Sequence, residues 1–185
     1  MVKVTVYIPT FNYGRYIEQA IQSVLKQTME DWELIVIDDG SADNTLDILA
    51  QYNNHPRIRI IEQENKGLNV TNNIALRLAN GKYIIRLDAD DYFDEHALEI
   101  LVNKFIRNPE IGMVFPDYYL IDESGNITDI IRRHNFDNVS LLDKPAHGAC
   151  TMLRTESLRD IGGYDESFSR QDGYELWIRF IQHYK

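Results

Sequence analysis

Short apolar segments rich in β-branched residues alternate with amphipathic helical segments through the first 109 residues of this 185-residue chain. Alternation of this kind produces right-handed crossovers, so that the strands run parallel and helices cover both faces of the sheet. The sequence therefore predicts an α/β fold with a Rossmann-like, mostly parallel central sheet. The predicted strands are 2–8, 34–37, 58–61 and 83–87, and the helices that follow them include 13–27, 46–49, 70–78 and 97–106.

The second half of the chain, after Pro109, has a less regular pattern. Its predicted elements are strands at 113–121, 127–131 and 148–154 and a last amphipathic helix at 174–184, with a turn at 123–126. The first two of these strands should form a small antiparallel pair. No Gly or Pro closes the last helix before Lys185, so we expect a chain truncated at its C-terminus. We treat 1–185 as one domain, with a nucleotide-binding half at 1–109 and a second half at 110–185.

The charge and the single cysteine exclude several classes of function. The formal net charge is −10 and the sequence pI is about 4.9, so the domain should repel nucleic acids and anionic lipid surfaces. Cys150 cannot form an internal disulfide, and no signal peptide or membrane-spanning segment is recognisable. We expect a cytoplasmic protein without a nucleic-acid partner, whose membrane association could come only from sequence beyond Lys185.

Polar residues gather directly after each predicted strand. In open α/β sheets ligands bind outside the carboxyl ends of the strands, so these residues are the first candidates for a site. Neither a GxxxxGK[ST] loop nor a GxGxxG motif is present, which disfavours kinases, ATPases, dinucleotide-binding enzymes and sugar-nucleotide pyrophosphorylases. The segments that follow the four strands are Pro9-Thr10-Phe11-Asn12, Asp38-Asp39-Gly40-Ser41, Glu64-Asn65-Lys66-Gly67 and Asp88-Ala89-Asp90-Asp91.

Asp88 and Asp90 are candidates for a metal site. Residues two apart on an extended segment point the same way, whereas Asp91 should point elsewhere. Two adjacent carboxylates repel each other unless a cation lies between them, and hard cations such as Mg²⁺ or Mn²⁺ bind carboxylate oxygens. A capping role before the helix at 97–106 is the competing interpretation, and we assign that role to Asp94. The cation would bridge the carboxylates to a nucleoside diphosphate.

Other polar residues admit two interpretations. Asp39 could accept hydrogen bonds from a uracil imide or a ribose, or could belong to an Asp-Gly turn that needs no ligand, with Asp38 supporting that turn. Asp172 with Glu175 fits a helix capping box. Lys66, Arg77 and Arg86 are candidates for phosphate partners, but a lone basic residue is more often solvated at the surface. The other assignments are to ordinary positions: Ser41 or Asp43 as helix cap, His147 in a loop, and Tyr118, Tyr119 and Trp177 in the core or at its rim.

Taken together, these motifs resemble the family 2 glycosyltransferases, and the resemblance covers essentially the whole chain. It implies a GT-A fold, an acceptor-side role for the half at 110–185, and inverting transfer of a hexosyl or N-acetylhexosaminyl group to a hydroxyl acceptor in a saccharide or lipid-linked molecule. The donor would be a nucleotide-diphosphate sugar, usually a UDP-sugar. The motifs are Tyr-Ile-Pro-Thr-Phe-Asn at 7–12, Ile-Asp-Asp-Gly-Ser at 37–41, Asn-Lys-Gly at 65–67, Leu-Asp-Ala-Asp-Asp at 87–91, Ile-Gly-Gly-Tyr-Asp-Glu-Ser-Phe at 161–168 and Gln-Asp-Gly-Tyr-Glu-Leu-Trp-Ile-Arg at 171–179.

The resemblance also implies a role for each motif residue. Asp172 would be the general base that deprotonates the acceptor hydroxyl. Asp90 would be the metal ligand and Asp88 would bind the ribose or the metal, so the cofactor would be Mn²⁺ or Mg²⁺, while Asp39 would bind the base. The remaining donor-binding positions are Pro9, Thr10, Asn12, Lys66, Gly67 and Ala89.

Two positions depart from the family pattern. Asn72 precedes Asn73 where many members have Arg, and Gln171 stands where an acidic residue often precedes the base. These departures leave open a second hypothesis, a non-catalytic nucleotide-binding module of a larger protein. A nucleotidyltransferase is a third hypothesis, and it would release pyrophosphate from a nucleoside triphosphate.

Overall fold

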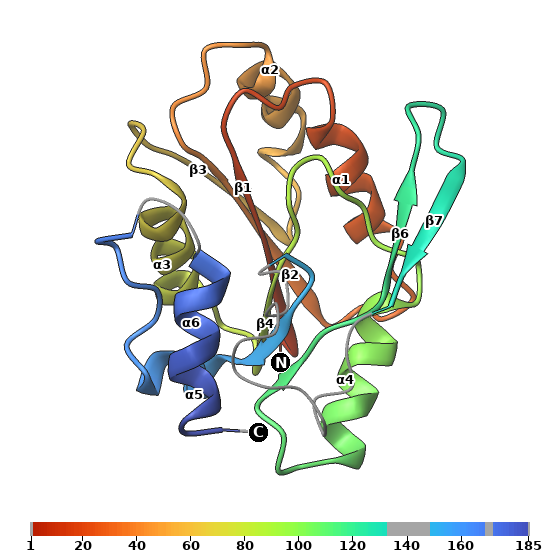
Figure 1. Cartoon of the computed structure of the whole chain (residues 1–185). Helices are drawn as coiled ribbons and strands as arrows, with labels where there is room; N and C mark the ends of the chain where they lie inside the picture. The colour runs from red at the N-terminus through yellow and green to blue at the C-terminus, as the bar shows by residue number, and fades with distance from the viewer. Residues whose placement is uncertain (1, 133–148, 169–171, 185) are drawn as a thin grey trace.

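A mixed sheet with strand order β3-β2-β1-β4-β8-β5 runs through the centre of the computed structural model (Figure 1). The structure describes residues 2–132, 149–168 and 172–184. β1 pairs in parallel with β2 and β4, and β2 with β3, while β8 is antiparallel to β4 and β5. The predicted mostly parallel sheet is therefore confirmed. The strands are β1 (Val4–Thr10), β2 (Trp32–Asp38), β3 (Ile58–Glu62), β4 (Tyr83–Arg86), β5 (Met113–Val114) and β8 (Met152–Arg154).

Helices cover both faces of this sheet, as the alternating pattern predicts (Figure 1). α1, α2 and α4 pack against one face through a core that includes Ile21, Leu101 and Phe105. α3, α5 and α6 pack against the other face, where Leu76 and Phe180 contribute to a second core. The bounds are α1 (Ile17–Leu25), α2 (Thr45–Leu49) with a 3₁₀ turn at Ala50–Tyr52, α3 (Leu68–Leu78), α4 (Ala97–Arg107), α5 (Thr155–Asp160) and α6 (Asp172–Ile181).

β1 extends further than its sequence predicts. We expected Pro9 to end this strand, because proline lacks the N–H that a ladder needs. The strand instead continues through Pro9 to Thr10. The β4 ladder ends at Tyr7, so beyond that point β1 pairs only with β2, where Pro9 lies opposite Ile37. A missing N–H is tolerated there, and the extension carries Thr10 to the carboxyl edge of the sheet.

The predicted strand at 113–121 is divided between two sheets. Its first part is β5 in the central sheet, and its second part, β6 (Tyr118–Ile121), pairs with β7 (Ile127–Ile131) in a separate antiparallel hairpin. Pro116 lies between the two parts and cannot continue a ladder. The hairpin extends away from the main body in Figure 1. Tyr118 and Tyr119 are 39% and 56% exposed on it, so neither packs in the core, which was one of the two positions predicted for them.

Helix caps also differ from the predictions. Asn44 and His96 occupy the N-cap positions of α2 and α4, and neither caps its helix through its side chain. Asp43 still supports α2, because its carboxylate accepts a hydrogen bond from the N–H of Thr45 at 3.0 Å. Asp94 accepts one from the N–H of His96 at 2.9 Å, one residue before α4 begins.

A buried carboxylate holds together the amino edge of the sheet, opposite the carboxyl ends of the parallel strands. Oε1 of Glu33 accepts hydrogen bonds from the Thr5 hydroxyl at 2.6 Å and the Asn80 N–H at 2.7 Å. Oε2 accepts from Asn80 Nδ2 at 2.9 Å and from Arg59 at 3.1 Å. Burial raises the pKa of Glu33, but the hydrogen bonds from Thr5 and Asn80 and the Arg59 charge together hold it below its ordinary value.

Replacing Glu33 with Gln should lower the free energy of unfolding at pH 7 by about 1–3 kcal/mol, because the amide group would direct a donor at other donors. The folded-state pKa is lowered, so the carboxylate stabilises the fold above its ordinary pKa and stops doing so as the pH falls through the folded-state value. Urea unfolding at pH 7 and at about pH 3 measures the free energy of unfolding of wild type and Glu33→Gln. The difference between the two proteins should be smaller at the lower pH.

Glu30 provides the control for this experiment, because it is exposed on the loop before β2. Glu30→Gln should change the free energy of unfolding by less than about 0.5 kcal/mol at either pH. If the free energies of unfolding of wild type and Glu33→Gln differ equally at the two pH values, the charged carboxylate of Glu33 does not stabilise the fold as described.

Candidate functional site

The carboxyl edge of the sheet brings together the ends of β1, β2 and β4. The N–H of Asp39 donates to the carbonyl of Thr10 at 2.8 Å, so the segments after β1 and β2 are joined where these strands end. Parallel pairing of β1 with β4 places the loop that begins at Asp88 beside them. Three of the four polar segments therefore meet at one edge, and the segment after β3 joins them through Asp39.

Asn12 shapes the loop after β1. It adopts a positive φ of 61°, which its short polar side chain tolerates better than most. Its N–H donates to the Ser41 hydroxyl at 2.8 Å, and its Oδ1 accepts from the N–H of Ala42 at 2.7 Å. Ser41 thus supports this loop rather than capping α2. The neighbouring ring of Phe11 is 43% exposed, so an apolar surface is available beside these polar groups.

The carboxylate of Asp39 is largely occupied by its own chain. Oδ1 accepts from Gln63 Nε2 at 2.6 Å and from the N–H of Lys66 at 2.8 Å, and Oδ2 accepts from the N–H of Gly67 at 2.9 Å. A carboxylate offers about four acceptor positions. Asp39 therefore organises the loop that contains Lys66 and Gly67, and about one acceptor position remains for a ligand.

Asp38 supports the turn beside Asp39, as the sequence indicates. Its Oδ2 accepts from the N–H groups of Gly40 and Ser41 at 3.2 and 3.0 Å. Asp38 also lines an open hollow at the ends of β2 and β3, together with Glu62 and Glu64. This hollow is therefore acidic, like the loop that contains Asp88 and Asp90.

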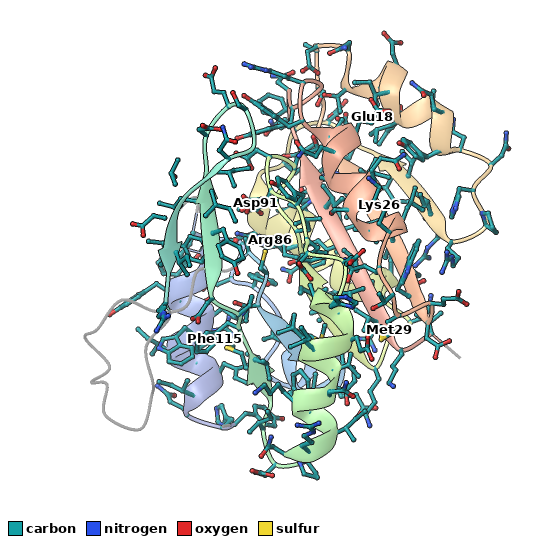
Figure 2. The ribbon with its side chains drawn as sticks, turned by 90° about the vertical axis from the view of Figure 1, so that its right-hand side faces the viewer. Glu18, Lys26, Met29, Arg86, Asp91 and Phe115 are labelled. Atoms are coloured by element: carbon teal, nitrogen blue, oxygen red, sulfur yellow. The ribbon has the colours of Figure 1, made fainter. Side chains whose placement is uncertain are left out.

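Arg86 is buried under the acidic loop, so its assignment to the solvated surface is wrong. It is 4% exposed, and its Nε lies 2.9 Å from Oδ1 of Asp88. In Figure 2 it lies inside the molecule, with Asp91 above it on the loop after β4. A lone Arg in an otherwise apolar strand was the signal for this role. Part of the charge of Asp88 is neutralised by this pair, whereas Asp90 is exposed.

The charge of the same loop affects the phenol of Tyr13. The pKa of its phenol is raised above the ordinary value, first by the charge of Asp90, then by partial burial and by the charges of Asp88 and Asp91. The loop carboxylates therefore share one region of negative potential near the start of α1. Neither Tyr13 nor Phe11 is among the site residues predicted from the sequence.

The acidic loop fits a divalent cation that is shared with a phosphate ligand. Mg²⁺ usually keeps several waters and binds one or two carboxylates together with substrate phosphates. Asp88 and Asp90 supply two carboxylates in a region whose negative potential is not fully balanced. Within residues 2–132, 149–168 and 172–184, no three His, Cys, Asp or Glu side chains form a metal site. Any cation would therefore need ligand oxygens to complete its coordination.

Several buried polar atoms in the described part of the chain lack hydrogen-bond partners. They include the hydroxyl of Thr10, which is 3% exposed, and both polar atoms of the side-chain amide of Asn72, which is fully buried in α3. Buried polar groups are normally hydrogen-bonded, so we expect water or ligand atoms at these positions. Lys66 and Arg77, in contrast, are exposed, as the sequence predicts.

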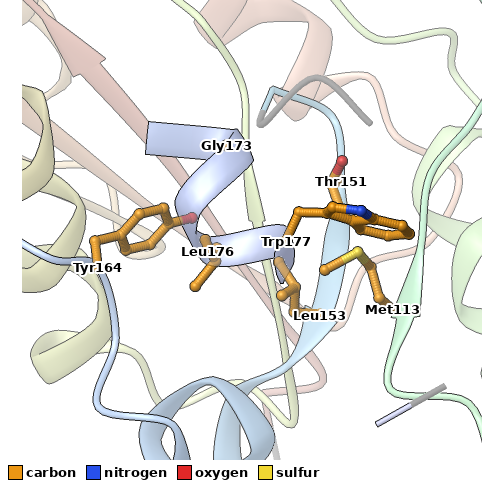
Figure 3. Close-up of a pocket in the computed structure, with 7 residues that line it drawn as sticks. All are labelled: Met113, Thr151, Leu153, Tyr164, Gly173, Leu176 and Trp177. Carbon is orange, nitrogen blue, oxygen red and sulfur yellow. The ribbon is translucent and has the colours of Figure 1, made fainter. Parts of the chain in front are cut away.

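α6 begins at Asp172 and packs beside β8 and β5. The Asp172 side chain, Gln171 and His147 lie outside the described residues, so the predictions for these side chains remain predictions. A cavity of about 20 Å³ lies under the first turn of α6 (Figure 3). This volume is close to that of one water, too small for a sugar. It is lined by Met113, Thr151, Leu153, Tyr164, Gly173, Leu176 and Trp177.

Glu175 is paired with Arg179 in α6. The described helices include none that is both long and apolar enough to cross a membrane.

Curated proteins similar to this chain include chondroitin and hyaluronan synthases. The chain is 35% identical to a chondroitin synthase of Escherichia coli over 183 residues, which is 97% of this chain and 26% of that protein. It is also 35% identical to a hyaluronan synthase of Pasteurella multocida over 187 residues, 97% of this chain and 19% of that protein. The chain thus spans about a quarter or less of the length of these relatives.

Solved structures with the same fold include two glycosyltransferase complexes. Staphylococcus aureus TarS 1-349 in complex with UDP-GlcNAc has a TM-score of 0.77 at 23% identity, over 96% of this chain and 52% of that one. The mannosyltransferase PcManGT from Pyrobaculum calidifontis, in complex with GDP-Man and Mn²⁺, has a TM-score of 0.76 at 23% identity, over 99% of this chain and 53% of that one. At this identity the likeness concerns the fold alone, and it confirms the GT-A prediction.

A sequence model of one family, described as glycosyl transferase family 2, matches residues 5–162. This region contains all four strand-end segments and most of the central sheet. The chain therefore belongs to glycosyl transferase family 2.

Proposed function

We propose that this domain is an inverting glycosyltransferase that moves a sugar from a nucleotide-diphosphate donor to a hydroxyl acceptor. The observation that carries the proposal is the convergence of Asp39, Asp88 and Asp90 at one edge of the sheet, in a chain that belongs to glycosyl transferase family 2. The names of the relatives support a role in polysaccharide or glycoconjugate synthesis, because they include chondroitin and hyaluronan synthases.

The nucleoside would bind at the ends of β1 and β2. Phe11 offers an exposed ring for stacking with a base, and Asp39 keeps about one acceptor position for a base or ribose N–H or O–H group. The buried hydroxyl of Thr10 can contribute a further polar contact. We propose UDP as the nucleotide, supported by an Escherichia coli relative, 28% identical over 97% of this chain, whose printed name specifies UDP-Glc.

The diphosphate would lie over the loop that contains Asp88, Ala89 and Asp90. A Mn²⁺ or Mg²⁺ ion bound there would neutralise the negative charge that develops on the departing diphosphate. Arg86 holds Asp88 in place from below, and the exposed carboxylate of Asp90 can reach a cation on the solvent side. This arrangement explains how a domain with a net charge of −10 can bind an anionic donor.

Asp172 would act as the general base. Its carboxylate takes the proton of the acceptor hydroxyl while the hydroxyl oxygen forms a bond to the anomeric carbon. The bond between this carbon and the diphosphate oxygen breaks on the opposite side, so the configuration inverts and the nucleoside diphosphate leaves with the electron pair. A saccharide or lipid-linked acceptor is consistent with the relatives, one of which is named for a sugar carried on diphosphoundecaprenol.

Replacing Asp90 with Asn should weaken UDP binding in the presence of Mn²⁺ by about tenfold or more, which corresponds to about 1.4 kcal/mol. The reason is that an amide is a poor substitute for a charged ligand of a hard cation. Calorimetric titration with UDP, CDP, GDP and TDP, each with and without Mn²⁺, measures this effect and identifies the nucleotide. The adjacent Asp91→Asn variant is the matched control, and its Kd should stay within about twofold of wild type. Binding that is equally strong without the metal would contradict the proposed site.

Replacing Asp172 with Asn should leave UDP binding unchanged and reduce sugar transfer by about 10²- to 10⁴-fold, the usual contribution of a general base. Titration with UDP and Mn²⁺ and a transfer assay that follows UDP release provide the two measurements. Asp160→Asn, at the end of the neighbouring helix α5, is the control and should retain both properties. Turnover that survives the Asp172 replacement would show that another group accepts the proton.

The same assays separate the competing functions. A non-catalytic nucleotide-binding module would bind UDP but show no transfer in the wild-type protein. A nucleotidyltransferase would release pyrophosphate from a nucleoside triphosphate in the presence of a sugar phosphate.

A further inference from the structure

The segment 161–168, which joins α5 to the region before α6, is held by amide side chains of α3. Nδ2 of Asn73 donates to the carbonyl of Tyr164 at 2.8 Å, and Oδ1 of Asn73 accepts from the N–H of Tyr164 at 2.9 Å. Nδ2 also donates to the Glu166 carboxylate at 2.8 Å. One buried amide thus pairs with both backbone groups of a single residue, much as a neighbouring strand would.

Asn69 makes a second connection of the same kind. Its Nδ2 donates to the carbonyls of Asp165 and Phe168, each at 2.8 Å. Asn69 and Asn73 are four residues apart, so they lie on the same face of α3. Both side chains are buried, and together they contact the segment 161–168 from Tyr164 to Phe168.

The first turn of α3 is fixed to the proposed donor site. The N–H of Gly67, directly before this helix, donates to Asp39, and the hydroxyl of Thr71 donates to the carbonyl of Gly67 at 3.0 Å. Nε2 of Gln63 lies within hydrogen-bonding distance of both the Thr71 hydroxyl and the Asp39 carboxylate, at 3.0 and 2.6 Å. The position of α3 at this edge is therefore set by Asp39.

α6 holds the segment 161–168 from the other side. Arg179 donates to the carbonyl of Ile161 at 2.6 Å and to the carbonyl of Gly163 at 2.7 Å, while Glu175 fixes its guanidinium. Gly163 has a φ of 73°, and a Cβ atom there would lie only 2.5 Å from Oδ1 of Asn73. The segment 161–168 therefore passes closely between α3 and α6, and its path depends on contacts with both.

We propose that Asn69 and Asn73 are positioning residues that set the place of Asp172 relative to the bound donor. The connection runs from Asp39 through α3 to the segment 161–168, and from there through Arg179 to the helix that begins at Asp172. This inference rests on the proposed function, because it takes Asp172 as the base. Misplacement of a reacting group by about 1 Å can reduce the rate by about 100-fold, so small shifts of α6 matter for transfer while donor binding is left intact.

The test compares Asn73→Ala with wild type in two assays. The first measures binding of UDP in the presence of Mn²⁺, and the second measures transfer as the release of UDP from UDP-sugars. The Kd for UDP should stay within about twofold, while kcat should fall by about 10- to 100-fold. Arg77→Ala, on the exposed face of the same helix, is the matched control and should change neither value. An unchanged kcat, or a loss of UDP affinity equal to the loss of kcat, would overturn the proposal.

Amide hydrogen exchange tests whether Asn73 affects the position of α6, and it does so even if the wild-type chain shows no turnover. The amides of Tyr164 and of the first turns of α6 should exchange faster in Asn73→Ala, while those of β1, β2 and β4 keep their rates. Glu166→Ala removes one of these contacts at an exposed position, so it should fold and show the same change to a smaller extent. Unchanged exchange in both variants would overturn the proposal, whereas absent wild-type turnover would count against the proposed function alone.

Discussion

The position of β1 between two parallel neighbours is the constraint on which the rest of this structure depends. Because β1 pairs with both β2 and β4 in the same direction, the chain leaves all three strands at one edge of the sheet. Four segments that are separated by 10 to 30 residues in a parallel α/β chain can meet only in this way, because each crossover helix returns the chain to the opposite edge. Glu33, Thr5 and Asn80 are hydrogen-bonded to one another at the opposite edge, so the polar groups there hold the fold together, whereas those at the carboxyl edge form the proposed donor site.

The carboxylates at this edge differ mainly in how many hydrogen bonds and ion pairs they form with other groups of the protein. Asp38 accepts hydrogen bonds from backbone N–H groups of its own turn, Asp39 accepts them from the loop after β3, and Asp88 lies against the buried Arg86. Asp90 is exposed, and its charge has the largest effect on the pKa of Tyr13. Like charges close together are costly unless each has a partner. The loop thus leaves the carboxylate of Asp90 facing solvent, and a cation shared with a phosphate would balance its charge.

The sequence predicts this edge well and its supporting contacts poorly, for a physical reason. The period of the strands and the polar residues that follow them are local properties, so Thr10, Asp39, Asp88 and Asp90 could be placed in advance. Arg86 was misassigned because its burial depends on Asp88 and on packing that local sequence does not contain. The antiparallel pairing of the hairpin β6–β7 was predicted correctly, but the division of its first strand at Pro116 was not. The partners of Asn69 and Asn73 lie more than 90 residues away along the chain, beyond the reach of any periodicity.

These non-local contacts have a consequence for how one fold can serve different transfer reactions. The proposed donor-binding groups lie on strand ends whose positions follow from the sheet, whereas the proposed base lies on a helix that contacts α3 through the segment 161–168. A change in those contacts would move α6 without disturbing the loops that bind the donor, since Asp39 anchors only the first turn of α3. Acceptor geometry can therefore vary while nucleotide binding is maintained. Amide side chains suit this task, because a single Asn offers both a donor and an acceptor to a backbone that has no strand beside it.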